Sequence, residues 1–448
     1  MIWLTAGVLF LIYLNAPAVA VRMHGAPFAL AAVVPLALAL PVAFRVLIRG
    51  EELRFPTVMI AALGMLALNA LSALFSVRPF ESMETVQTWL LEGAFLALLT
   101  ANAIRTREEL RAAIMAIVGA GALMGAIALA QQILGPAEHP FFGFGQLDSA
   151  IADASGQLTR RLAGPIGETN RFAQIMAVLI PIAAGLGLSL RGRLRIAAFV
   201  AVGLIAAGMA FAFSRGAIVA LGLAVPFAVA FRMLRWRQVI IAGLLGLMLL
   251  VAMPHYAKRV VSIGQIAARS LGLDPTGMRN ADGAARGRLT EMKAAGMLFL
   301  DNPWMGAGPG MAPYYYEDFA SVVGGKVRAG NRRSHNLYLQ LAAETGVVGL
   351  GAFGVTLFLV FRALDRTRRR AEQNDRELWA IVCGLELALV ISLTTSLFLH
   401  AAYIRYFWIL IGLASAASLQ PAPPALVAFL ARALRETAAR IRRDQVQT

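Results

Sequence analysis

The chain has 448 residues, of which 59% are hydrophobic and 15% are charged, and its formal net charge is +16. Its apolar runs repeatedly reach the roughly 20 residues that a helix needs to cross a bilayer, and they lack the alternation of barrel strands. An all-α polytopic membrane bundle is therefore predicted and a β-barrel excluded. The positive charge lies in short arginine clusters between apolar runs, as topology signals do, so we expect no nucleic-acid partner. The single cysteine, Cys383, excludes an internal disulfide bond.

We predict about twelve membrane-spanning helices. The predicted spans are residues 2–21, 27–44, 55–77, 86–104, 112–134, 171–190, 196–213, 216–231, 239–253, 338–361, 379–399 and 403–420. The first run has no basic segment before it and no evident cleavage site, so we interpret it as a retained span and not as a signal peptide.

Arginine clusters fall in every second connection between these spans. They comprise Arg45, Arg49 and Arg54; Arg105, Arg107 and Arg111; Arg191, Arg193 and Arg195; Arg232, Arg235 and Arg237; and Arg362, Arg366, Arg368, Arg369 and Arg370. The positive-inside rule places these clusters and both termini in the cytoplasm, and the segments 135–170 and 254–337 on the opposite face.

The chain is divided into a membrane domain, residues 1–420, which includes the outer loop 254–337, and a tail, residues 421–448. The tail spaces apolar residues at helical intervals against arginines. This pattern indicates an amphipathic helix that lies on anionic membrane lipids, although a solvated tail fits equally well.

The segment 135–170 ends in Arg160 and Arg161, followed by a Gly-Pro turn and Asn170 at the mouth of the sixth span. Taken alone, these residues are interpreted as a turn that starts a helix. Arg215 stands between two apolar runs that have almost no loop between them. A charge so close to hydrocarbon is costly, so Arg215 is a functional candidate, unless it only reaches out to the lipid headgroups.

The outer loop is polar and carries many more cations than a connection requires. Its basic residues include Arg269, Arg279, Arg286, Arg288, Lys293, Arg332 and Arg333. A long loop between two spans usually has a function, and this one is predicted to hold an anion at the membrane surface. Arg288 begins an amphipathic helical stretch, which a Pro- and Gly-rich segment at 301–310 ends. The glycine spacing is more typical of a tight turn than of a phosphate loop.

His335 lies where this loop meets the next apolar helix, after Arg333 and before Asn336. An imidazole titrates near neutral pH, as a general base requires, although a lone histidine is more often structural. Ser334 is expected to be the N-cap of the following helix if the motif is only structural, with Asn336 in the turn. The apolar runs hold few ionisable residues, chiefly Glu92, Glu344 and Glu386, which argues against a proton-coupled transporter.

Four stretches resemble the O-antigen ligase and O-antigen polymerase superfamily of bacterial inner-membrane glycosyltransferases, in that family's order. They are residues 167–173, 214–217, 287–310 and 334–350, and the resemblance covers residues 165–360. The last stretch, which begins Ser-His-Asn-Leu-Tyr, is the most specific. Met292 departs from the pattern, because the family more often has an aromatic residue there.

The resemblance implies a GT-C-like enzyme that transfers a glycan from undecaprenyl pyrophosphate to an acceptor on the periplasmic face, which in ligases is the lipid A core. It also implies that no metal or other cofactor is needed. Carried over by motif, the catalytic residues are Arg215, Arg288 and His335. The predicted substrate contacts are Arg215, Arg288, Arg286, Asn336, Tyr338, Arg161 and Asn170.

The chemistry fits these residue types. A glycosyl pyrophosphate needs its departing negative charge stabilised, which arginines do with paired hydrogen bonds. An acceptor hydroxyl must lose a proton as it attacks, which a histidine can accept, and direct displacement inverts the anomeric centre.

Three alternatives stay open. A polymerase of O-antigen or exopolysaccharide would use the same lipid-linked donor. A protein O-glycosyltransferase is less favoured, since no further C-terminal domain for a protein acceptor is evident. A lipid-linked glycan flippase or transporter is disfavoured by the long outer loop and the sparse charges within the spans.

Overall fold

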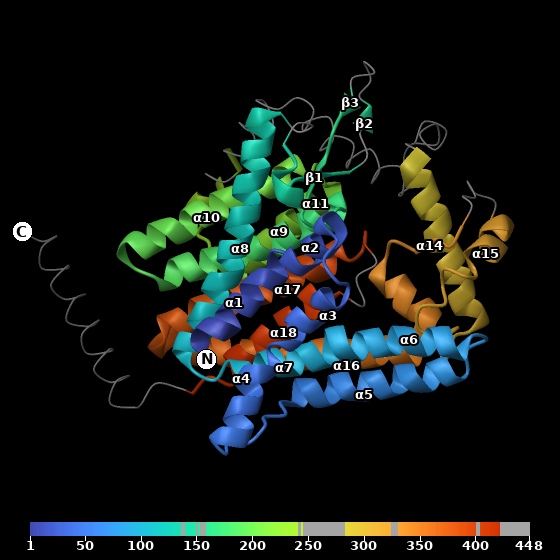
Figure 1. Cartoon of the computed structure of the whole chain (residues 1–448), viewed down its shortest axis with the longest axis horizontal. Helices are drawn as coiled ribbons and strands as arrows, with labels where there is room; N and C mark the ends of the chain where they lie inside the picture. Colours follow the sequence, from blue (N-terminus) through green and yellow to red (C-terminus); the bar gives the residue numbers. More distant parts are fainter. Residues whose placement is uncertain are drawn as a thin grey trace, which may run out of the picture.

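The computed structural model describes residues 1–135, 139–148, 151–152, 158–240, 243–244, 283–323, 330–399 and 404–421. The described residues are mostly helical (Figure 1), which confirms the predicted class. The helices are α1 (Ile2–Tyr13), α2 (Ala16–His24), α3 (Ala29–Leu36), α4 (Ala39–Ala43), α5 (Thr57–Leu74), α6 (Pro79–Trp89), α7 (Leu96–Ala103), α8 (Arg107–Leu134), α9 (Thr169–Ser189), α10 (Gly192–Phe211), α11 (Arg215–Ala230), α14 (Gly283–Asp301), α15 (Tyr316–Val322), α16 (Leu337–Asn374), α17 (Arg376–Thr395) and α18 (Arg405–Ser418). Short π or 3-10 segments are η1 (Phe44–Ile48), η2 (Leu90–Phe95) and η3 (Phe141–Gly143). Two small antiparallel pairs join β1 (Gln146–Leu147) to β4 (Leu162–Gly164) and β2 (Ile151–Ala152) to β3 (Leu158–Thr159).

Within the described residues, seven helices are long and apolar enough to cross a membrane, and an eighth results if α1 and α2, which meet at 51°, form one bent span. The predicted count of twelve is therefore not confirmed. Two predicted spans correspond to α11 and α18, which have only 16 and 14 residues. The one predicted at 86–104 is interrupted by η2, which carries Glu92. Most of the one predicted at 239–253 lies outside the described residues, as does the tail from residue 422.

The centre of the bundle is built on close contact between α9 and α17, which lie side by side with α8, α10 and α11 around them (Figure 1). In the apolar window of each of these two helices, 78% of the residues are buried. A Cβ atom added at Gly185 on α9 would lie 2.4 Å from the carbonyl oxygen of Ala380, and one at Gly384 on α17 would lie 2.7 Å from that of Pro181. Small residues let helix backbones approach within a bilayer, where apolar side chains gain little from meeting each other.

The arginine clusters predicted to share one face do come together at one end of the bundle, which we call the ion-pair end. Arg45 contacts Glu109 and lies 3.2 Å from Glu51, which Arg105 approaches at 3.1 Å. Burial opposes ionisation of Glu51, but its hydrogen bond to Arg45 and the charges of Arg45, Arg105 and Arg49 outweigh burial and lower the pKa of Glu51. The carboxylate therefore stays ionised at neutral pH, and the network stays intact.

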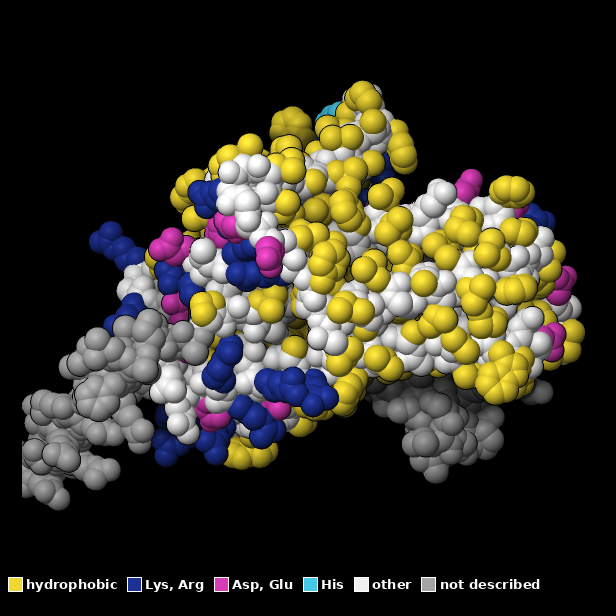
Figure 2. Space-filling model, turned by 90° about the horizontal axis from the view of Figure 1, so that it is seen from below, with side chains coloured by type: hydrophobic (Ala, Val, Ile, Leu, Met, Phe, Trp, Pro, Cys, Tyr) yellow, Lys and Arg dark blue, Asp and Glu magenta, His cyan; other side chains and the backbone are white. Residues whose placement is uncertain are grey.

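Further pairs extend this network across the helices. They join Arg107 to Asp375 at 2.8 Å, Arg111 to Glu377 at 2.7 Å, Arg232 to Glu372 at 3.3 Å and Arg368 to Glu386 at 2.8 Å. The arginine-rich stretch 362–370 is part of helix α16 and is not the loop that was expected. On the face drawn in Figure 2, charged side chains gather in the left half, while hydrophobic side chains cover most of the right half. This distribution agrees with the predicted topology, although the side of the membrane stays a prediction.

The glycine-rich segment after α14 forms backbone hydrogen bonds with both sides of a break in α16. Gly346 has φ +63° and ψ −166°, so the helix is interrupted there. The carbonyls of Ala343 and Glu344 accept hydrogen bonds of 2.9 Å each from the N–H groups of Ala307 and Gly308. In return, the N–H groups of Val347 and Val348 donate to the carbonyls of residues 303 and 304 at 2.8 and 3.3 Å. The loop backbone thus replaces the helical hydrogen bonds that the break removes, as a bilayer requires.

The same contact explains the spacing of the glycines, and it favours the tight turn over the phosphate loop. Gly306, Gly308 and Gly310 all have φ between +70° and +106°. A Cβ at Gly306 would lie 2.3 Å from backbone atoms of Glu344 and Thr345, and one at Gly346 would lie 2.1 Å from the carbonyl oxygen of residue 304. Only glycine fits both conformation and space here. The outer segment that carries α14 is therefore fixed to the start of α16.

We expect Gly306→Ala to destabilise the protein by about 1–3 kcal/mol, because the added methyl group clashes with backbone and the left-handed conformation is strained. The matched control is Gly296→Ala on α14, where a Cβ meets nothing within 4 Å and alanine favours the helix by about 1 kcal/mol. Thermal unfolding of both variants in detergent measures the difference. A Gly306→Ala variant that melts at the wild-type temperature would show that the loop is not locked into α16.

Candidate active site

Four of the described helices, α9, α11, α16 and α18, begin at the end of the bundle opposite the ion-pair end; we call it the outer end. Helices α16 and α17 fix this assignment, because Asp365 and Glu377 lie in the ion-pair network while Leu337 donates a 2.9 Å hydrogen bond to the carbonyl of Ser396 at their other ends. Each helix start presents N–H groups and a partial positive charge, so several starts in one region favour an anion there.

The turn before α11 is held by residues predicted to bind substrate. Arg161, which is 9% exposed, donates through Nη2 to Oδ1 of Asn170 at 3.1 Å and through Nε to the carbonyl of Ala212 at 3.1 Å. Ser214 Oγ donates to the same Asn170 oxygen at 3.3 Å. Phe213 takes φ +52°, which lets α10 end and α11 begin within a few residues. The structure thus brings Arg161 and Asn170 to the turn that presents the half-buried Arg215.

His335 lies against a carboxylate that sequence reasoning did not select. Its Nδ1 is 3.6 Å from Oε2 of Glu291, which is 3% exposed, and 3.0 Å from the carbonyl oxygen of Arg333. A carbonyl oxygen can only accept a hydrogen bond, so Nδ1 carries a proton and Nε2 is the nitrogen with a lone pair in the neutral ring. The left-handed backbone of His335, φ +48°, is a conformation that non-glycine residues seldom adopt outside functional sites and turns.

Helix α14 joins Arg288 to this pair. Arg288 is half-buried, and Glu291 follows it by three residues, which puts both on neighbouring positions of one helix face. The side chain of Arg286, a predicted substrate contact, lies outside the described residues. Two sequence clues pointed to Glu291: its spacing from Arg288 and its place in an amphipathic helix. Neither clue could reveal that α14 packs beside the start of α16.

The residues that follow α17, which ends at Thr395, connect the Arg215 turn to His335. Asn336 donates through Nδ2 to the carbonyl of Leu397 at 3.1 Å. The next residue, Phe398, packs on Gly216, whose added Cβ would lie 3.1 Å from the ring. The start of α11 and the start of α16 therefore face the same short segment.

Asn336 and Tyr338, predicted to contact substrate, both make bonds within the protein. Asn336 is the N-cap of α16, since its Oδ1 accepts from the N–H of Leu339 at 2.9 Å. The expectation that Ser334 is the N-cap was therefore wrong, because the left-handed His335 makes Asn336 the last non-helical residue; Ser334 Oγ donates to the Asn336 carbonyl instead. Tyr338 donates its hydroxyl proton to the carbonyl of Leu393 at 2.9 Å. A substrate contact for either residue stays a prediction.

The outer end also holds Arg171, an arginine that sequence reasoning did not select. Arg171 lies 3.3 Å from Glu168 and within Coulombic range of Arg22, Arg333 and the ring of Tyr406. Arg171 stood inside a motif that was interpreted only as a turn that starts a helix. The signal in the sequence that could have selected Arg171 was its position, one helical turn before Gln174 and Ile175 on α9.

Comparison with known proteins agrees with the motifs. Residues 200–354 match a family model described as O-antigen ligase, while a search of the curated proteins found no match. The matched range contains Arg215, Arg288 and His335. Members of this family are glycosyltransferase-like ligases and polymerases, and the membrane-spanning helices are those of an integral inner-membrane protein. The match at residues 200–354 is consistent with the O-antigen ligase superfamily that the motifs indicated.

Proposed function

We propose that this protein transfers a glycan from undecaprenyl pyrophosphate to the lipid A core oligosaccharide on the periplasmic face of the inner membrane. The observation that carries the proposal is the meeting, at the outer end, of the Arg215 turn with His335 and its partner Glu291, within the O-antigen ligase domain. The positive-inside rule supports the periplasmic side, because the arginine-rich ion-pair end would then face the cytoplasm.

The arginines stabilise the leaving group. As the bond from the sugar C1 to the pyrophosphate oxygen breaks, its electron pair stays on the pyrophosphate, whose charge must be balanced. Arg215, at the N-terminus of α11, combines its guanidinium charge with the helix dipole. A guanidinium binds two phosphate oxygens at once. Arg288, on α14, provides a second guanidinium for the same leaving group. We expect no metal ion or other cofactor to be required.

His335 accepts the proton of the acceptor. The sugar hydroxyl of the core gives its proton to Nε2 of His335 while its oxygen attacks C1 from the side opposite the pyrophosphate, so the configuration at C1 is inverted. Protonation leaves an imidazolium whose Nδ1–H stays hydrogen-bonded to the carbonyl of Arg333, which holds the orientation of the ring. The buried carboxylate of Glu291, 3.6 Å from Nδ1, stabilises the positive charge of the ring.

Arg215→Ala should lower kcat/KM about a hundredfold, which corresponds to about 3 kcal/mol of lost transition-state stabilisation. Arg215→Lys should recover little of this, because an ammonium group cannot bind two oxygens in one plane. Arg191→Ala, an exposed arginine at the far end of α9, is the control and should retain activity. Near-full activity of Arg215→Lys would contradict the paired hydrogen bonds, though not the reaction.

Glu291→Gln should lower kcat about tenfold, because the amide keeps the shape of the side chain but not the charge that stabilises the imidazolium. KM should change little, since Glu291 acts on the base and not on the donor. Steady-state kinetics of the variant beside Glu84→Gln, an exposed carboxylate on α6, separate the two parameters. An unchanged kcat, or a loss confined to KM, would remove Glu291 from the mechanism.

Deletion of the gene distinguishes the ligase from the other functions. Lipopolysaccharide and the carrier-linked glycan are extracted and compared on a gel. A ligase predicts long glycan retained on undecaprenyl pyrophosphate together with bare lipid A core. Single repeats still joined to the core would mean a polymerase, and unchanged lipopolysaccharide would reject both reactions in favour of a secreted exopolysaccharide or transport.

A further inference from the structure

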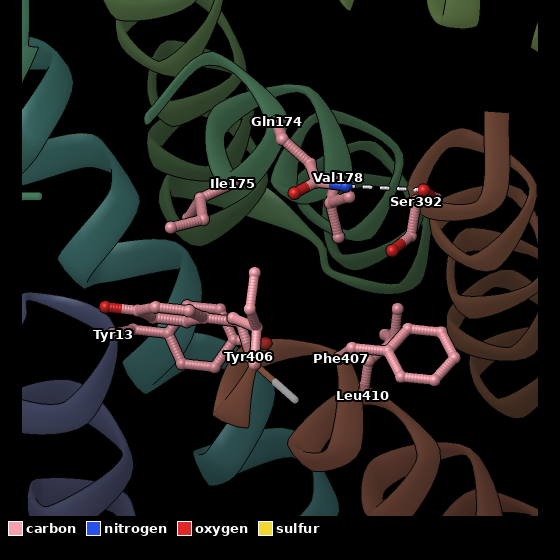
Figure 3. Close-up of a pocket in the computed structure, with 9 residues that line it drawn as sticks. Tyr13, Gln174, Ile175, Val178, Ser392, Tyr406, Phe407 and Leu410 are labelled. Carbon is pink, nitrogen blue, oxygen red and sulfur yellow. Dashed lines mark hydrogen bonds between the residues drawn. The ribbon is translucent and has the colours of Figure 1, made fainter. Parts of the chain in front are cut away.

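Two side-chain amides on α9 bind different segments of the outer end. Asn170 and Gln174 are four positions apart, so they lie on one face of the helix, about 6 Å from each other along its axis. Asn170 accepts hydrogen bonds from Arg161 and from Ser214, which precedes Arg215. Gln174 reaches across to α17 instead (Figure 3). The two amides thus hold the turn before α11 and the end of α17 at a fixed separation along α9.

The amide of Gln174 is fixed by three acceptors. Gln174 is 7% exposed, and its Nε2 lies 2.7 Å from Oγ1 of Thr395, 3.3 Å from Oγ of Ser396 and 3.3 Å from the carbonyl oxygen of Ser392. Both hydroxyls give their protons to carbonyls of α17, so their oxygens are available as acceptors. A carbonyl oxygen can only accept, which sets the amide with its nitrogen toward α17. Figure 3 shows this nitrogen directed from α9 toward Ser392.

The end of α17 also receives hydrogen bonds from the segment that carries His335. The N–H of Leu337 donates to the carbonyl of Ser396 at 2.9 Å, and Nδ2 of Asn336 donates to the carbonyl of Leu397 at 3.1 Å. Ser396 is therefore bound at its side chain from α9 and at its carbonyl from α16. The two residues that follow His335 are fixed to residues whose position α9 sets.

His335 needs such support because of its backbone. Its φ of +48° is a strained conformation, which persists only where the surrounding structure holds it. The hydrogen bonds of Asn336 and Leu337 to the end of α17 supply this restraint on the C-terminal side of His335. Loss of the Gln174 donor would leave Ser396 with fewer restraints at a buried position, where water replaces a lost partner poorly.

We infer that Gln174 is a positioning residue, which holds the end of α17, and through it His335, at a set distance from the Arg215 turn. The inference rests on the proposed function, which gives His335 and Arg215 their roles in transfer. Direct displacement needs the acceptor oxygen and the departing oxygen in line on opposite sides of C1, and a misplacement of about 1 Å can cost about a hundredfold in rate. The two groups precede or begin different helices, and α9 contacts the supports of both.

Gln174→Met keeps the length of the side chain and removes the donor. With full-length protein in nanodiscs and labelled lipid-linked glycan, kcat should fall about tenfold while KM changes little, because the base is displaced and donor binding is not. The matched control is Gln420→Met, a glutamine that is 1% exposed at the ion-pair end and donates to Ala416 in the last turn of α18. The control should keep the wild-type kcat.

A double-variant cycle distinguishes positioning from general loss of stability. Gln174 and Glu291 both act on His335 in this account, so Gln174→Met combined with Glu291→Gln should lower kcat by much less than the product of the two single losses. Thr395→Val removes the closest acceptor with nearly the same shape, and it should add little to Gln174→Met. Losses that multiply in full, in variants that melt at the wild-type temperature, would show that Gln174 does not act through His335.

Hydrogen exchange followed by mass spectrometry tests the same link without the reaction. Gln174→Met should speed exchange in peptides that contain the Leu337 amide about tenfold, since the acceptor of that amide is loosened. Gln420→Met should leave this exchange unchanged. Wild-type exchange at Leu337 in a folded Gln174→Met variant would overturn the inference, whether or not the protein transfers glycan. Faster exchange beside a wild-type protein that transfers nothing would support the link between Gln174 and His335 and reject the proposed function.

Discussion

The break in α16 at Gly346 is the constraint on which the outer half of the molecule depends. Within a bilayer, a helix that stops leaves N–H and C=O groups that water cannot reach, and another backbone must pair with them. The segment from Pro303 to Gly308 does so by giving two donors and two acceptors to the interrupted turn. Because α14 leads directly into this segment, pairing also fixes α14 beside the start of α16. This pairing places Glu291, on α14, 3.6 Å from His335, which precedes α16.

The second organising feature is the gathering of helix starts and arginines at one end. At the ion-pair end, arginines such as Arg45 and Arg368 are matched by carboxylates and serve stability. At the outer end, Arg171 has a carboxylate partner and the neighbouring Arg22 and Arg333 do not among the described residues. Like charges held close together cost stability, and under the proposed function a diphosphate substrate offsets this cost. The two ends thus use the same residue type for different purposes.

Much of this arrangement could be predicted from the sequence. Long apolar runs identify the helices, because the bilayer imposes one length and one period. Clusters such as Arg105 to Arg111 indicated which ends of the spans meet. The family motifs identified Arg215 and His335, and the structure brings the segments that carry them to one region. These predictions depend on local pattern alone.

The rest depends on tertiary contacts that local pattern does not contain. The N-cap at Asn336 followed from the left-handed backbone at His335, which nothing in the sequence required. Glu291 and Arg171 could be recognised as site residues only from their neighbours on other segments of the chain. The predicted count of twelve spans is not confirmed, since α11 and α18 have only 16 and 14 residues and most of one predicted span lies outside the described residues.

The central claim is that His335 and the arginines at the outer end perform the transfer without another protein. Purified protein in nanodiscs is incubated with undecaprenyl-pyrophosphate-linked glycan, labelled in the sugar, and with lipopolysaccharide that carries only the core. The account predicts that label moves to the core with wild-type protein and remains on the carrier with folded His335→Ala. Label that stays on the carrier with wild-type protein, or that moves equally well with His335→Ala, would contradict it.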